Sequence, residues 1–229
     1  MKKYTNTTAG GISLMTIIVI IISLIWMAVT LLVGKLGYYE YTREADHALV
    51  IMTVLLPTIV YFLAFATLKS VRDWTTTLDL AILTLPHAWR TVGFTFLTLW
   101  FYDFLPGGFA SPAGFGDFGI AIAAPFVAVA LWFNYRGAVK SAVLFHCLGL
   151  LDLVVALYTG VNGFGIKPEN MHLIDPMTQF PLVIIPTVFV PLLILSHIMV
   201  FTKLLLIKNR EVAKDKPDYS QTSNEQYCP

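Results

Sequence analysis

Six long apolar stretches, separated by short polar connections, dominate this chain. They cover Ile12–Val33, Ala48–Leu68, Leu78–Tyr102, Asp117–Phe133, Ser141–Tyr158 and Phe180–Leu206. A helix needs about 20 mainly apolar residues to cross roughly 30 Å of hydrocarbon, whereas a membrane β-barrel shows alternating strands of about 10 residues. The pattern therefore predicts an all-α fold, a polytopic transmembrane bundle of six helices.

The connections between these stretches predict the domain organisation. Lys69–Thr77 is expected to be a short charged turn, and Asp103–Gly116, which is rich in glycine and proline, is expected to be a loop. Residues 1–207 then form one six-helix transmembrane domain. Residues 208–229 are mostly polar and are expected to form a disordered cytoplasmic tail.

Lysine and arginine are distributed unevenly between the two ends of the predicted bundle. One end collects the basic residues within 2–3, 69–72, 136–140 and 203–216, whereas the other end has only Lys35, Arg43 and Lys167. Loops rich in positive charge stay on the cytoplasmic side of a membrane. The charge pattern therefore predicts that both the N-terminus and the C-terminus are cytoplasmic.

Composition agrees with a membrane protein and excludes several classes of function. The chain is 57% hydrophobic and only 13% charged, and its net charge of +1 gives no basis for binding nucleic acid. Two cysteines do not make a disulfide framework. The sequence has no Walker A loop, dinucleotide fingerprint, H-E-x-x-H or G-x-S-x-G motif. No catalytic residue is therefore assigned, and a non-enzymatic role is favoured, although the sequence does not decide it.

Arg90 lies near the middle of the third apolar stretch. A cation at the centre of a membrane helix costs at least about 2.5–3.5 kcal/mol, and arginine does not lose its proton in proteins. Arg90 therefore needs an anionic partner, and we expect it to pair with Asp152, the acidic residue nearest to mid-depth. Asp117 is the second candidate, but at the start of the fourth stretch we expect it to cap a helix. The pair could be structural, or it could form a gate, a proton relay or an anion site.

Three histidines are expected at similar depth in the cytoplasmic half of the membrane. His87 lies three residues before Arg90 and on the same helix face, and His146 and His197 lie in two other predicted helices. Three imidazoles at one depth could bind a metal ion, or two of them could ligate haem. The alternative is that each histidine is bonded separately to backbone or hydroxyl groups.

The sixth stretch carries three prolines in its first half, Pro181, Pro186 and Pro191. Each proline removes a helical hydrogen bond and leaves a carbonyl without its usual donor. Broken helices in membranes often line a cavity, so Thr187 is a candidate ligand-binding residue beside Arg90, Asp152, His87 and Asp117. The alternative is a kinked helix that packs on its neighbours.

Several short motifs in the second half of the chain occur together. They are RTVG from Arg90, PAGFGD from Pro112, GLLDLVVA from Gly149, IPT from Ile185 and VPL from Val190. Together they resemble a family of small bacterial multipass inner-membrane proteins with no assigned activity, over about residues 80–205. The resemblance implies the bacterial inner (plasma) membrane as the location, and it implies no function.

The leading hypothesis is a carrier or binder of a small anionic or polar ligand that does not use ATP, with Arg90 as the charged anchor. A second hypothesis is a haem- or metal-binding redox protein that uses His87, His146 and His197; the cofactor stays open. A third is an accessory or assembly subunit. The lipid bilayer is the expected partner in all three, and a second copy or another membrane protein is compatible with each. A large polar cavity at Arg90 would favour the first hypothesis, a shared histidine centre the second, and a packed interior the third.

Overall fold

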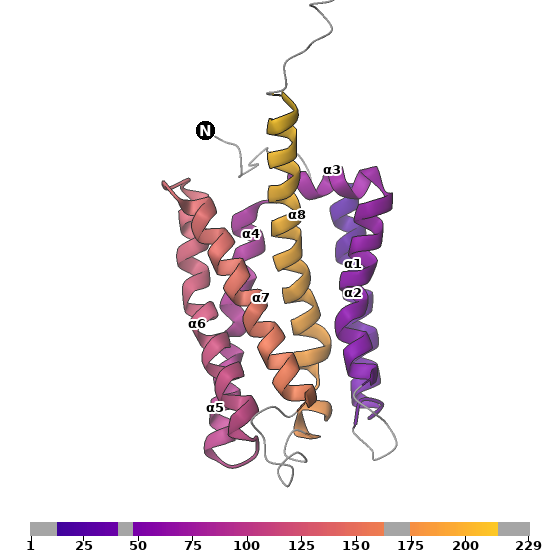
Figure 1. Cartoon of the computed structure of the whole chain (residues 1–229). Coiled ribbons are helices and arrows are strands. Elements are labelled where there is room, and N and C mark those ends of the chain that lie inside the picture. The colour runs from indigo at the N-terminus through magenta and orange to yellow at the C-terminus, as the bar shows by residue number, and fades with distance from the viewer. Residues whose placement is uncertain (1–12, 41–47, 163–174, 215–229) are drawn as a thin grey trace, which may run out of the picture.

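The computed structural model describes residues 13–40, 48–162 and 175–214, and the described elements are all helices (Figure 1). Five of them are long and apolar enough to cross a membrane, so the chain is an all-α membrane protein. The α-helices are α1 (Leu14–Lys35), α2 (Ala48–Thr67), α3 (Lys69–Thr77), α4 (Leu80–Thr84), α5 (Phe94–Phe101), α6 (Gly107–Trp132), α7 (Ala138–Asn162) and α8 (Val190–Lys214). The irregular helices include the 3₁₀-helix η1 (Leu85–Gly93) and the π-helix η3 (Ile185–Phe189), and a further 3₁₀ turn covers residues 175–178.

The segment predicted as the third span is broken into three pieces. It runs from α4, at the same end of the bundle as α3, through η1 to α5 at the opposite end (Figure 1). Pro86 lies in the first turn of η1, and a proline cannot donate the backbone hydrogen bond that would continue α4. The structure therefore has five long candidate spans and, in addition, this discontinuous segment.

The prediction of a loop over Asp103–Gly116 is wrong for most of its length. α6 already begins at Gly107, and it contains Pro112 as well as Pro125. The small residues that suggested a loop allow α6 to lie close to its neighbours, because a Cβ at Gly114 would come within 2.6 Å of Leu97. Close packing of small residues stabilises membrane helices and here outweighs low helix propensity.

The charged connection between the second and third spans is a helix and not a turn. α3 lies across one end of the bundle (Figure 1) and buries Val71 and Trp74. Arg72 lies on the same helix, and its Nη1 donates to the carbonyls of Phe65 and Ala66 at 2.9 Å each. This contact satisfies the last carbonyls of α2, so the charged residues of α3 complete the end of the preceding span.

The prolines of the last span produce a π-helix followed by a long α-helix. Pro186 lies in η3, and the Leu182 carbonyl, which Pro186 leaves without its usual donor, accepts from the Ile185 N–H at 3.0 Å. α8 then continues to Lys214, so the helix extends beyond residue 207, where the sequence placed the start of the tail. Residues 215–229 lie outside the described part.

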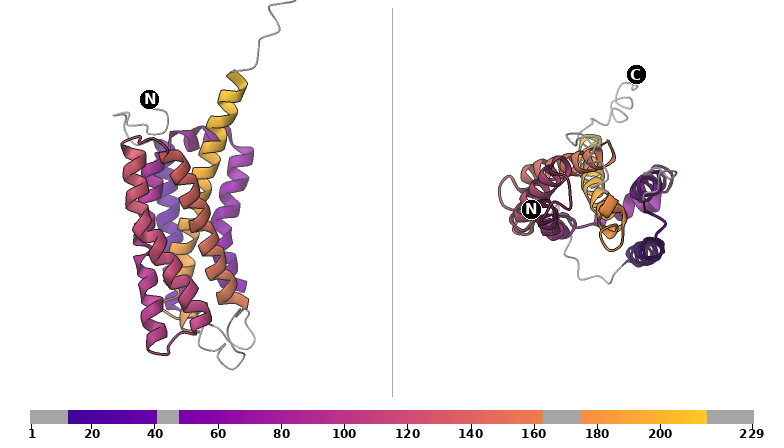
Figure 2. Two further views of the ribbon diagram at one scale, coloured as in Figure 1. Left: turned by 60° about the vertical axis from the view of Figure 1, so that its left-hand side comes forward. Right: turned by 90° about the horizontal axis from the view of Figure 1, so that it is seen from below.

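Both ends of the described chain lie at the same end of the bundle. Near the start of α1, Thr16 accepts from Trp74 Nε1 on α3 at 3.0 Å, and near the end of α8, Arg210 lies 3.4 Å from Asp73 on α3. α6 packs along η1 and α7, and α8 lies between α7 and the pair α1–α2 (Figures 1 and 2). The interior of this arrangement contains buried polar residues, among them Arg90 and three histidines.

Candidate functional site

A line of buried residues at every third position runs along the broken third segment. The side chains at these positions are 3% exposed or less, and the buried set is Ala81, Thr84, His87, Arg90 and Phe96, with Gly93 also buried. In a 3₁₀-helix the side chains at positions i and i+3 lie directly above one another. The 3₁₀ geometry of η1 therefore places His87 and Arg90 on one interior face.

Arg90 is the centre of a buried ionic cluster. Its Nε donates to Asp117 Oδ1 at 2.6 Å, its Nη1 donates to the Gly149 carbonyl at 3.1 Å, and its Nη2 donates to Asp152 Oδ2. The two aspartates come from α6 and α7, so this ionic cluster (Arg90, Asp117 and Asp152) joins three elements. With both carboxylates ionised, its formal charge is −1.

Glycines make the close approach of these elements possible. A Cβ at Gly93 would overlap Asp117, and a Cβ at Gly116 would overlap the Asp152 carboxylate. A Cβ at Gly149 would lie 2.5 Å from His197 Cε1 and 3.3 Å from Arg90 Nη1. Larger residues at these three positions would therefore separate the helices that bring the charges together.

The predicted pairing of Arg90 with Asp152 is confirmed. The prediction that Asp117 caps a helix is wrong, because α6 begins at Gly107 and Asp117 lies inside it as a second partner of Arg90. Thr187 lies apart from this cluster: it is buried, and its hydroxyl donates to the Val183 carbonyl at 2.7 Å within the last span. The same carbonyl also accepts from the Thr187 N–H at 3.1 Å, so the hydroxyl bonds within its own helix.

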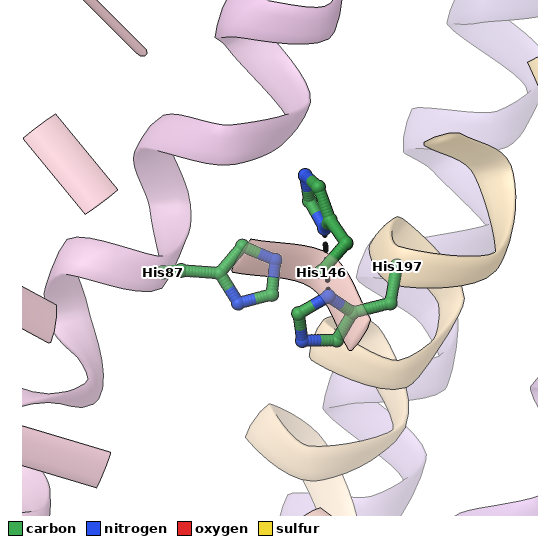
Figure 3. A group of neighbouring side chains, drawn as sticks. All are labelled: His87, His146 and His197. Atoms are coloured by element: carbon green, nitrogen blue, oxygen red, sulfur yellow. Dashed lines mark hydrogen bonds between the residues drawn. The ribbon is translucent and has the colours of Figure 1, made fainter. Parts of the chain in front are cut away.

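The structure also brings the three histidines together. His87, His146 and His197 come from η1, α7 and α8, all three have 0% exposure, and their rings face one another (Figure 3). One ring nitrogen from each lies within 4.8 Å of the others. His146 Nδ1 and His197 Nδ1 are 2.7 Å apart and hydrogen-bonded. We call this group the histidine cluster.

A cavity of about 380 Å³ reaches the ionic cluster, because Arg90 and Asp117 are among its lining residues. The irregular helices η1 and η3 both line it, and the ring centroids of Trp89 on η1 and Phe189 on η3 are 4.7 Å apart. Most of its wall is apolar, and its polar groups are Arg90, Asp117 and Ser196. The cavity is therefore mainly apolar, with a few polar groups in its lining.

Two residues of this region were not assigned to a site from the sequence. Thr84 Oγ1 is 3.1 Å from His146 Nε2, and Ser196 Oγ is 2.7 Å from His87 Nε2. The sequence does carry a signal for Thr84, because Thr84, His87 and Arg90 are polar residues spaced three apart within an apolar stretch.

Comparison with protein-family models matches residues 47–205 to a family described as a domain of unknown function, DUF8737. The matched region is more than half of the chain, and it contains all the residues of the ionic cluster and the histidine cluster. It also includes α2, which the resemblance based on short motifs did not cover. No curated protein and no solved structure matches the chain.

Proposed function

Because the chain belongs to the DUF8737 family, whose description gives no activity, we propose its function from the polar interior. The proposal is that the protein binds, and carries without ATP, a small amphipathic ligand whose polar group lies at the ionic cluster. The observation that carries it is the cavity between η1 and η3, whose lining includes Arg90 and Asp117.

The irregular helices support this proposal. Broken helices at membrane depth are tolerated where they line a cavity, and π-helical turns are frequent at functional sites. η1 and η3 lie far apart in the sequence, yet they line the same cavity. A purely structural kink would not require two such segments to face one another.

The charges favour a neutral polar group over an anion. Arg90 is already paired with two carboxylates, so an anionic ligand would add negative charge to a cluster whose formal charge is −1. Nη1 and Nη2 each carry a second N–H that has no acceptor among the described residues. A carbonyl or hydroxyl oxygen is the group that these donors would bind, which favours the polar over the anionic alternative of the expected ligand.

We also propose that the chain crosses the membrane six times, with both termini in the cytoplasm. The segment α4–η1–α5 would be the sixth crossing, beside the five long helices. The basic residues Lys69, Arg72, Arg136, Lys208 and Arg210 support the cytoplasmic assignment of the end that holds α3. The resemblance to bacterial proteins supports the inner membrane as the location.

Filling the cavity tests the proposal. We would substitute Leu193→Trp, which places an indole in the cavity wall, and Leu205→Trp, a matched control on the same helix whose side chain is exposed on the outer surface. Native mass spectrometry of protein extracted in nanodiscs would measure the bound small molecule. We expect it in the wild type and in Leu205→Trp, and a loss of at least about tenfold in Leu193→Trp. Equal occupancy in the two variants would contradict the proposal.

A further inference from the structure

The histidine cluster lies beside the ligand cavity but has a chemistry of its own. Its three rings are fully buried, and their centroids are 4.1 to 5.5 Å apart. These separations leave no room for a porphyrin between two of the rings, so the geometry disfavours haem. We propose that His87, His146 and His197 bind one late first-row transition-metal ion, copper or zinc.

The hydrogen bonds around His146 fix the position of its proton. The Thr84 hydroxyl donates to the Leu80 carbonyl at 2.7 Å, so it accepts from His146 Nε2 at 3.1 Å. The Nδ1 atom of neutral His146 is then an acceptor, and His197 Nδ1 donates to it at 2.7 Å. His197 Nε2 therefore carries a lone pair, and it has no hydrogen-bond partner.

His87 is held in the same way. The Ser196 hydroxyl donates to the Leu193 carbonyl at 2.9 Å, so it accepts from His87 Nε2 at 2.7 Å. The lone pair of His87 is then on Nδ1, which is buried and also has no partner. Buried polar atoms are nearly always hydrogen-bonded, so two unpartnered lone pairs in one cluster point to a group that accepts electron pairs.

This arrangement resembles the surroundings of a metal site. A histidine that binds a metal ion usually donates its other ring N–H to a neighbouring oxygen, which fixes the tautomer. Ser196 and Thr84 supply that oxygen for His87 and His146. An ion bound to His87 Nδ1 and His197 Nε2 would take its third ligand from His146 Nδ1, in place of the hydrogen bond from His197.

The neighbouring charges do not oppose a cation. Arg90 is a neighbouring positive charge, since its Nη1 and the His197 ring both lie against Gly149. Asp117 and Asp152 pair with Arg90 and leave a formal charge of −1. Imidazole ligands suit copper and zinc, and both ions can use three protein ligands.

The test uses the full chain in detergent, in a Cys147→Ser/Cys228→Ser background that removes binding by thiols. After treatment with a chelator, the protein is titrated with Zn(II), and separately with Cu(I) under anaerobic conditions in competition with a chromophoric chelator. We expect about one ion per chain with one of the two metals, and binding at least about tenfold weaker in His87→Gln and His197→Gln. Phe145→Leu, which alters a ring packed on the cluster without removing a ligand, is the matched control and should bind normally.

X-ray absorption on the loaded wild-type protein needs no variant and decides the case if a histidine variant does not fold. Nitrogen ligands at roughly 2.0–2.1 Å would support the site. Failure of the wild type to retain either metal, a shell without nitrogen, or unchanged binding in both histidine variants would each overturn the proposal.

Discussion

At the scale of single residues, the interior depends on how Arg90, which has no neutral form, is compensated. Arg90 stays charged, and its side chain is 1% exposed, so the two carboxylates and one carbonyl that contact it replace its hydration. Removing one member of such a group leaves an uncompensated charge, which costs more than the pair itself contributes. Thr84 and Ser196 have a similar role for the histidines, because their hydroxyl oxygens accept the Nε2–H groups of His146 and His87.

Arg90→Leu should destabilise the protein by about 3–5 kcal/mol, because it leaves two buried carboxylates without a cation. Arg90→Leu/Asp152→Leu should be less destabilised than the sum of the single variants by about 0.5–3 kcal/mol, because the two residues are in contact. Unfolding in mixed detergent micelles would give these free energies. Asp73→Leu removes a carboxylate from an exposed pair and should change stability by no more than about 0.5 kcal/mol. Additive losses for Arg90 and Asp152 would contradict the pairing.

Thr84→Val should destabilise the protein by about 1–3 kcal/mol, because His146 Nε2–H then lacks an acceptor in the interior. Thr98→Val is the matched control. Both hydroxyls donate to the carbonyl four residues earlier, but Thr98 is exposed and has no histidine partner. The control should change stability by less than about 0.5 kcal/mol. Thermal unfolding of the two variants side by side measures the difference, and equal losses would show that the bond to His146 contributes nothing.

At the scale of elements, helix geometry decides which side chains meet. The 3₁₀ form of η1 aligns every third residue, so Thr84, His87 and Arg90 share one face. In an α-helix, three residues do not complete a full turn, and these side chains would be offset from one another. α6 supplies the matching surface through Gly114 and Gly116, which let the helix approach η1, α5 and α7. These small residues on α6 therefore bring the Asp117 carboxylate within reach of Arg90.

Gly116→Ala and Gly119→Ala make a direct test of this packing. A Cβ at Gly116 would overlap the Asp152 carboxylate, whereas a Cβ at Gly119 would meet nothing within 4 Å. We expect Gly116→Ala to destabilise the protein by about 1–3 kcal/mol through overpacking. Gly119→Ala should be neutral or stabilise the helix by up to about 1 kcal/mol. The free energy of unfolding measures both, and a neutral Gly116→Ala would show that α6 and α7 are less tightly packed than described.

At the scale of the whole molecule, α3 marks one end of the bundle, and the start of α1 and the end of α8 both contact it. The same end carries Arg136 in the connection between α6 and α7, whereas Tyr102 and Asp103 lie at the other end, after α5 (Figure 1). The proposed topology has an even number of crossings, and the five long candidate spans of the described residues fit it only if α4–η1–α5 also crosses the membrane.

Labelling of single cysteines in intact cells tests the orientation. In a background without Cys147 and Cys228, we expect Asp103→Cys to react with a membrane-impermeant maleimide. Asp73→Cys and Arg136→Cys should react only after the cells are permeabilised, because we propose that the basic end faces the cytoplasm. Reaction of Asp73→Cys and Asp103→Cys from the same side would contradict the sixth crossing.

The sequence by itself determined that this is a helical membrane protein, because long apolar stretches have one stable environment. It also determined that Arg90 needs a carboxylate such as Asp152, because a permanent cation in hydrocarbon must be compensated. These are requirements of single segments and single charges. It did not reveal the helix over Gly107–Gly116 or the role of Asp117, because glycine and proline favour loops until a neighbouring helix packs on them.

Only the tertiary structure decided what meets in the interior. His87, His146 and His197 are far apart in the chain, and no local spacing relates them. They converge because η1 is a 3₁₀-helix and because Gly149 lets His197 and Arg90 lie against α7. Which side chains share a site depends on the register between helices, and that register is fixed by packing of small residues across elements, which no single segment of the sequence encodes.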